Sequence, residues 1–132
     1  NIKNNISYYD TGDICKITKN KLLIFIGRKR EIIKKGGLLI SLKDVSSILK
    51  LNRNVNEACA VKIYHEFYGE DYIIFYTVNY KKNLSNIPNW FREQLPKYKW
   101  PRDMIVIKNF KKTPSGKINI NFLKKKFLNE IK

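Results

Sequence analysis

Residues 72–78 (YIIFYTV) decide the fold, because aromatic and β-branched side chains at this density favour a strand buried in a sheet. Residues 57–64 (EACAVKIY) alternate between apolar and polar positions and predict a second strand. We expect residues 69–71 (GED) to form the turn between the two, since Gly and Asp are frequent in turns. Residues 104–107 (MIVI) predict a third strand.

Helical patterns flank these strands. Ser41 begins a capping box, and apolar residues at helical spacing follow it as far as residue 49. Residues 87–95 carry apolar side chains at i, i+3, i+4 and i+8, which predicts a second amphipathic helix. Residues 122–131 predict a short terminal helix, capped by Asn119 or Asn121.

The first forty residues predict hairpins. Gly36 and Gly37 separate two short extended runs, which is typical of a two-residue hairpin turn. Residues 14–17 and 22–26 predict strands that would pair with a sheet outside this chain. The expected fold class is therefore α+β: a small domain with an N-terminal β-hairpin and a roughly three-stranded mixed or antiparallel sheet packed against about three helices.

The composition describes one globular domain with a strong positive charge. Of 132 residues, 43% are hydrophobic, and the formal net charge is +16. A basic surface suits an anionic ligand such as a nucleotide or coenzyme A, and it also suits nucleic acid. The basic residues are mostly lysine and not arginine clusters interleaved with aromatics, so nucleic-acid binding is the weaker interpretation.

The cysteine and histidine residues do not form the sequence pattern of a metal site or of a Cys/His nucleophile pair. Cys15 and Cys59 are far apart without a CxxC pair, and His65 is the single histidine, so we expect no metal. We expect both cysteines to be buried or half-buried. The N-terminal segment is polar, and the apolar runs are shorter than a membrane span, so the expected location is cytoplasmic.

Residues 113–118 (TPSGKI) contain a Gly-Lys pair but do not form a P-loop. That motif requires a glycine where Lys111 stands and a Ser or Thr where Ile118 stands. Taken alone, the segment is better explained by an ordinary turn.

Four segments together resemble the adenylate-forming superfamily, which includes acyl-CoA synthetases, luciferases and the adenylation domains of peptide synthetases. Residues 8–13 (YYDTGD) resemble its Y-x-TGD motif, and residues 27–37 (GRKREIIKKGG) resemble its hinge motif. Residues 98–101 (YKWP) resemble its Y-K-x-P segment, and residues 113–118 resemble its closing motif ending in Gly-Lys. All four stand in the family's order, over a length that matches its C-terminal quarter.

The resemblance implies a ligase that joins a carboxylate to ATP, forming an acyl-adenylate, and then passes the acyl group to a thiol. It implies ATP with Mg²⁺, held mainly by a large domain outside this chain, and CoA or the phosphopantetheine of an acyl carrier protein as acceptor. It also implies that Lys117 is the catalytic cation of adenylation, and that Asp13 and Arg28 bind the nucleotide. A cation suits the first step because negative charge builds on the phosphoryl oxygens.

The same resemblance implies a hinge at Arg30, where most members have Asp or Lys, and a pantetheine channel lined by Gly36 and Gly37. Residues 38–39 (LL) and Ile120 depart from the polar residues common in acyl-CoA synthetases. The acceptor therefore stays open among CoA, a carrier protein and an amine.

The expected domain division is a tail of the large adenylation domain at residues 1–28 and a mobile C-terminal domain at residues 29–132. On this interpretation the fragment alone is inactive. The alternatives are a stand-alone basic module that binds nucleic acid or an acidic partner, and a degenerate ligase domain kept as a scaffold.

Overall fold

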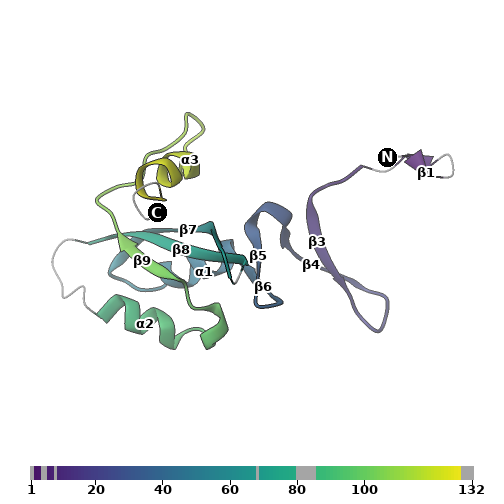
Figure 1. Cartoon of the computed structure of the whole chain (residues 1–132), viewed down its shortest axis with the longest axis horizontal. Helices are drawn as coiled ribbons and strands as arrows, with labels where there is room; N and C mark the ends of the chain where they lie inside the picture. The colour runs from purple at the N-terminus through teal and green to yellow at the C-terminus, as the bar shows by residue number, and fades with distance from the viewer. Residues whose placement is uncertain (1, 4–5, 8, 68, 80–85, 129–132) are drawn as a thin grey trace.

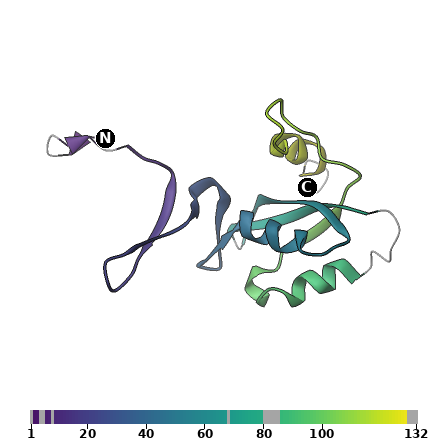
Figure 2. The same ribbon diagram turned by 180° about the vertical axis from the view of Figure 1, so that it is seen from behind.

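A computed structural model describes residues 2–3, 6–7, 9–67, 69–79 and 86–128. Figure 1 shows a layered sheet-and-helix body with hairpins of the N-terminal part extending away from it, and the reversed view in Figure 2 shows the same separation. The expected α+β class is confirmed. No helix among these residues is long and apolar enough to cross a membrane.

The sheet is built around β8 (Gly69–Val78), as the pattern of its residues predicts. It pairs antiparallel with β7 (Val55–His65) along its whole length and parallel with β9 (Asp103–Val106). The sheet is therefore mixed, and β8 has a neighbour on each edge. This placement explains why residues 71–77 are all buried.

The two faces of β8 supply two separate cores. Tyr72, Ile74 and Tyr76 pack in one core with α1 (Leu42–Lys50) and α2 (Ile87–Glu93). Ile73 and Phe75 pack in the other with Val61, Phe110 and Leu123, the last of which belongs to α3 (Ile120–Leu123). Helices thus cover both faces of the sheet, because side chains alternate along a strand.

The predicted helix caps are present. The Ser41 side-chain oxygen accepts a hydrogen bond from the Asp44 backbone N–H at 3.2 Å. Of the two candidate caps of the last helix, Asn119 is the one used, since its side chain accepts from the Phe122 N–H at 3.0 Å. This helix continues as a π-helical turn (Lys124–Leu128), and the last residues predicted for it lie outside the described part of the chain.

The turn predicted at residues 69–71 is wrong. The chain turns at Glu66 and Phe67, and Gly69 already pairs with His65 as the first residue of β8. Asp71 lies within the strand with 7% of its surface exposed. A carboxylate can occupy this position because Lys35, on a strand that is distant in sequence but adjacent in the sheet, is ion-paired with it.

The Gly-Gly hairpin is confirmed. β5 (Ile32–Lys35) and β6 (Leu38–Ser41) pair antiparallel, and Gly36 and Gly37 have φ angles of 56° and 84°. Positive φ at both turn positions is the conformation that a tight hairpin requires and that glycine adopts without strain. In the described part of the chain, the backbone of the hairpin pairs with β8 at Lys35 and Gly69.

The N-terminal hairpins carry apolar side chains that the described residues leave uncovered. β1 (Ile2–Lys3) pairs with β2 (Ile6–Ser7), and β3 (Asp13–Ile17) pairs with β4 (Leu23–Arg28). Ile17 and Phe25 are 69% and 60% exposed. The expectation that Cys15 is buried is therefore wrong, because no second layer packs on β3 within the described part, whereas Cys59 is half-buried as expected.

Replacing Ser41 by Ala should lower the free energy of unfolding of the chain by about 1 kcal/mol, because the first turn of α1 loses its capping acceptor. Chemical denaturation followed by circular dichroism measures the change. Ser47→Ala is the matched control, since Ser47 is exposed in the middle of the same helix and donates only to the Lys43 carbonyl. Equal effects of the two substitutions would contradict the capping role.

Cys15 and Cys59 should differ in the rate at which their thiols are alkylated. Burial raises the pKa of Cys59 to about 11, an effect that Lys112 partly opposes. At pH 8 only about one Cys59 thiol in a thousand is then ionised, and the thiolate is the reactive form. Mass spectrometry of the iodoacetamide-treated chain should show Cys15 modified first, and labelling of Cys59 should rise tenfold per pH unit between pH 8 and 10. Equal initial labelling of both thiols would contradict the burial of Cys59.

Candidate functional site

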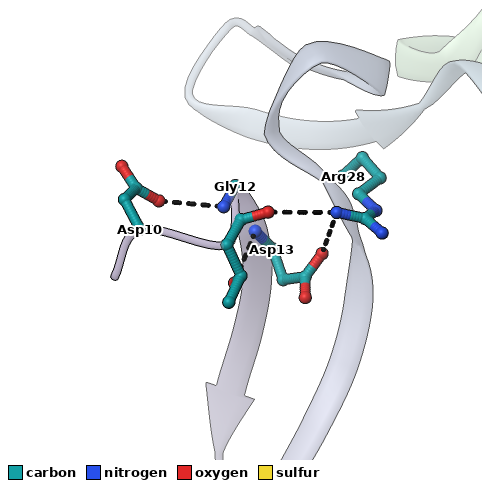
Figure 3. A network of polar contacts seen from close by, with 5 residues as sticks. Asp10, Gly12, Asp13 and Arg28 are labelled. Atoms are coloured by element: carbon teal, nitrogen blue, oxygen red, sulfur yellow. Dashed lines mark hydrogen bonds and ion pairs between the residues drawn. The ribbon is translucent and has the colours of Figure 1, made fainter. Parts of the chain in front are cut away.

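The first part of the site is a corner at the start of β3, drawn in Figure 3. Asp10 Oδ1 accepts a hydrogen bond from the Gly12 N–H at 2.9 Å, and Thr11 Oγ1 accepts one from the Asp13 N–H at 3.3 Å. Gly12 has a φ of 72°. Short polar side chains that bond to the backbone two residues later stabilise a turn of this kind. The turn directly precedes Asp13, the first residue of β3.

Asp13 and Arg28, both predicted from the sequence, are brought together at this corner. They face one another across the β3–β4 ladder, and Arg28 Nη1 lies 3.1 Å from Asp13 Oδ1 (Figure 3). The same Nη1 donates to the Thr11 carbonyl at 3.0 Å. The Arg28 side chain is 53% exposed and the Asp13 side chain is 31% exposed. The pair therefore adds little to the stability of the chain, and its groups remain accessible to a ligand.

Beside the pair lies a hollow of about 440 Å³ whose polar lining is cationic. Arg28, Lys29 and Arg30 line it together with the Thr11–Gly12 turn, and the Lys29 N–H donates to the Gly12 carbonyl at 2.7 Å. Fixed positive charge of this density favours an anionic ligand. Lys29 was not singled out from the sequence, where it occupies the variable position of the hinge motif.

Lys117, the third predicted residue, lies on an exposed loop that is closed by its own hydrogen bonds. A bridge between Lys112 and Ile118 closes its base, and the Thr113 N–H donates to the Lys117 carbonyl at 2.7 Å. Thr113 Oγ1 accepts from the Lys117 N–H at 3.3 Å. Gly116 has a φ of 84° with open space where a Cβ would stand, so the glycine serves the backbone conformation and relieves no clash. The loop backbone is thus held by hydrogen bonds, while Lys117 is exposed.

The structure does not bring Lys117 to the Asp13–Arg28 corner. In Figures 1 and 2 the loop before α3 lies above the sheet body, whereas the β3–β4 hairpin lies beside the body and well apart from that loop. Gly36 and Gly37 form a third exposed tip, at the end of β5. The predicted residues therefore occupy three separate places in this arrangement of the chain.

A basic groove of about 310 Å³ beside α1 was missed from the sequence. Its floor includes the half-buried Cys59 and apolar residues of β7, and its cations are Arg30, Lys43, Lys50, Lys62 and Lys124. These cations come from four segments far apart in the chain, with Lys43 and Lys50 both on α1, so no local pattern could identify the groove. Arg30, the predicted hinge residue, lines both this groove and the hollow at the corner.

The described residues contain no group of three or more His, Cys, Asp or Glu side chains that could hold a metal ion. The donor set of the corner consists of two carboxylates, Asp10 and Asp13, of which Asp13 is paired with Arg28, beside three cations. That set does not suit a divalent cation, and we assign no metal ligand within it.

Comparison with known proteins identifies relatives over nearly the whole chain. It is 30% identical over 128 residues to the medium-chain fatty-acid–CoA ligase of Escherichia coli K12, covering 94% of this chain and 23% of that ligase. It is 29% identical over 126 residues to a 2-succinylbenzoate–CoA ligase of Staphylococcus epidermidis, covering 96% of this chain and 27% of that ligase. The chain thus spans about a quarter of the length of these curated relatives.

A comparison with solved structures also finds proteins that share this fold. The crystal structure of ATP-bound MatB from Rhodopseudomonas palustris superposes with a TM-score of 0.73 at 21% identity, over 92% of this chain and 25% of that one. At this identity the match establishes the fold alone. A family model, that of the AMP-binding enzyme C-terminal domain, matches residues 44–117, which is more than half of the chain. This chain belongs to the AMP-binding enzyme C-terminal domain family of the adenylate-forming ligases.

Proposed function

We propose that this chain is the C-terminal part of an ATP-dependent ligase that forms an acyl-adenylate and then a thioester with CoA or a carrier protein. The observation that carries the proposal is the exposed Lys117 on its closed loop, in a chain whose relatives are CoA ligases. In this proposal residues 1–28 end the large domain, residues 29–132 form the mobile domain, and the large domain holds Mg²⁺ and the acid.

Lys117 would supply positive charge at the adenylation step. When the carboxylate oxygen attacks the α-phosphorus, charge grows on the phosphoryl oxygens and on the departing pyrophosphate, and an ammonium group stabilises it. The hydrogen bonds between Thr113 and Lys117 support this role, because a fixed loop delivers the cation with little further loss of backbone entropy. Lys117 moves no proton in this mechanism.

Asp13 and Arg28 would bind the nucleotide. A carboxylate can accept hydrogen bonds from two vicinal ribose hydroxyls, and the guanidinium of Arg28 has further N–H donors beyond the one that contacts Asp13 and Thr11. The ion pair fixes the orientation of both groups before the ligand arrives. The adjacent Lys29 and Arg30 add attraction for phosphates.

The places at which the glycine turn and the Lys117 loop are attached to β8 support a rotation of the domain between the two half-reactions. The glycine turn joins β8 at Gly69, its first residue. The Lys117 loop is tied near the other end, because Lys112 is ion-paired with Glu57, which pairs with Thr77. The two anchors are roughly 25 Å apart along an extended strand. One rigid body cannot place both tips at one reaction centre at once, so a turn about Arg30 would exchange them.

Replacing Lys117 by Ala in the full-length enzyme should lower adenylation by about a hundred- to a thousandfold, because the charge on the leaving group loses its partner. Pyrophosphate exchange measures this step. Thioester formation from supplied acyl-adenylate should stay within about twofold of wild type. Lys108→Ala, at an exposed lysine of the preceding loop, is the control. Wild-type exchange in the Lys117 variant would refute the assignment.

Replacing Asp13 by Ala should raise the KM for ATP by roughly tenfold or more, because hydrogen bonds to a charged group contribute about 1.5–3 kcal/mol. The unfolding free energy of the protein should change by less than about 1 kcal/mol, since the pair with Arg28 is exposed. Asp103→Ala is the control, at an exposed carboxylate at the start of β9. An unchanged KM in the Asp13 variant would exclude the nucleotide role.

A further inference from the structure

The β5–β6 hairpin is held to the domain by the buried Ile33 and Ile40 of its two strands, but its backbone pairing with the sheet is short. Among the residues that the structure describes, its backbone ladder to β8 consists of the pair Lys35 with Gly69. Both turn glycines, Gly36 and Gly37, follow Lys35 directly and are exposed. Backbone pairing alone would leave the turn end of the hairpin, beyond the buried Ile33 and Ile40, free to move about this contact.

A polar cluster around the Lys35 ammonium group compensates for the short ladder. Lys35 Nζ lies 3.0 Å from Asp71 Oδ1 and donates a hydrogen bond to the Trp100 carbonyl at 2.6 Å. The Lys35 and Asp71 side chains are only 23% and 9% exposed. One nitrogen thus joins three segments: the hairpin, the central strand and the turn that follows α2.

Each partner of Lys35 is itself held in place. Asp71 Oδ1 accepts from the Tyr72 N–H at 2.8 Å, and the hydroxyl of the buried Tyr72 donates to the Lys99 carbonyl. The Trp100 ring N–H donates to the Arg92 carbonyl at 3.0 Å, at the end of α2. The acceptors therefore belong to the rigid body of the domain. A charge-assisted contact to fixed acceptors restrains the position of the donor strongly.

A second carboxylate of β8, that of Glu70 next to Asp71, also contacts β5. Glu70 Oε2 accepts a hydrogen bond from the Lys34 backbone N–H at 2.7 Å. Lys62 of β7 forms an ion pair with the same carboxylate. The hydrogen bond from Lys62, and then that from the Lys34 N–H, lowers the pKa of Glu70 and so keeps it ionised at neutral pH.

We propose that Lys35 is a positioning residue, whose ion pair with Asp71 clamps the glycine turn to β8 so that the turn moves as one body with the rest of the domain. The inference rests on the proposed function, in which this turn lines the thiol channel. The clamp then serves the thioester step and not adenylation, because Lys117 is anchored near the opposite end of β8. A displacement of about 1 Å at a reacting centre costs up to a hundredfold in rate.

The test compares Lys35→Met with Lys34→Met in the full-length enzyme. Lys34 is the matched control because its side chain is exposed and its contribution to Glu70 comes from the backbone, which the substitution keeps. Lys35→Met should lower kcat/KM for CoA in thioester formation from supplied acyl-adenylate by roughly ten- to a hundredfold. Pyrophosphate exchange should stay within about twofold, and Lys34→Met should leave both steps unchanged.

Two further variants separate positioning from folding. Lys35→Met leaves the Asp71 carboxylate buried without its cation, which can destabilise the protein. The double variant Lys35→Met/Asp71→Asn removes both charges and keeps an acceptor for the Tyr72 N–H, so it should fold and show the same selective loss. Lys35→Arg keeps a cation and should recover part of the activity.

Hydrogen exchange gives a readout that does not need the reaction. Amides of residues 32–41 should exchange faster in the double variant, while those of β7 and β8 should keep their wild-type rates. Unchanged exchange at residues 32–41, or an equal loss of both half-reactions in the double variant, would overturn the clamp. Absence of pyrophosphate exchange in the wild-type enzyme would instead overturn the proposed function, and hydrogen exchange would still decide whether the clamp exists.

Discussion

Burial of β8 on both faces and along both edges is the constraint on which the rest of the structure depends. Seven consecutive residues, 71–77, are buried, so each face needs a covering layer and each edge needs a partner strand. α1 and α2 supply one layer, and α3 with Phe110 supplies the other. The body that results is rigid at its centre, and the loops and turns that carry exposed chemistry project from its ends.

Polar groups can be buried in such a strand only where each has a hydrogen-bond or ion-pair partner that is itself held in place. Asp71 is accepted because Lys35 and the Tyr72 N–H contact its carboxylate, and the Tyr72 hydroxyl is accepted because it donates to the Lys99 carbonyl. Burial raises the pKa of Tyr72, with a smaller contribution from Asp71, so the hydroxyl stays protonated and continues to donate. Among the described residues no buried side-chain nitrogen or oxygen lacks a hydrogen-bond partner. The polar cluster thus costs little stability, and it ties three segments together.

Features with a local cause could be predicted from the sequence, and features with a distant cause could not. The caps at Ser41 and Asn119 and the glycine turn depend on residues within four positions of one another, and all three are confirmed. The expected turn at residues 69–71 was wrong because the partner that admits Asp71 into a strand lies in β5. The basic groove beside α1 was missed for the same reason, since tertiary packing alone assembles its cations. Cys15 was misjudged because apolar residues of β3 and β4 indicate a buried strand, whereas no described layer of this chain covers them.

The arrangement of charge also explains how a chain with a formal net charge of +16 can present one cation at a defined place. Most of the described lysines are exposed, so each adds to a diffuse field that salt screens within about 10 Å. Lys117 differs in its backbone, because the Thr113 hydrogen bonds and the positive φ of Gly116 hold the base of its side chain. Long-range attraction can come from any of the lysines, but stabilisation of a transition state requires a charge within contact distance and in a fixed direction. The closed loop, and not the abundance of lysine, therefore gives Lys117 the geometry that adenylation would require.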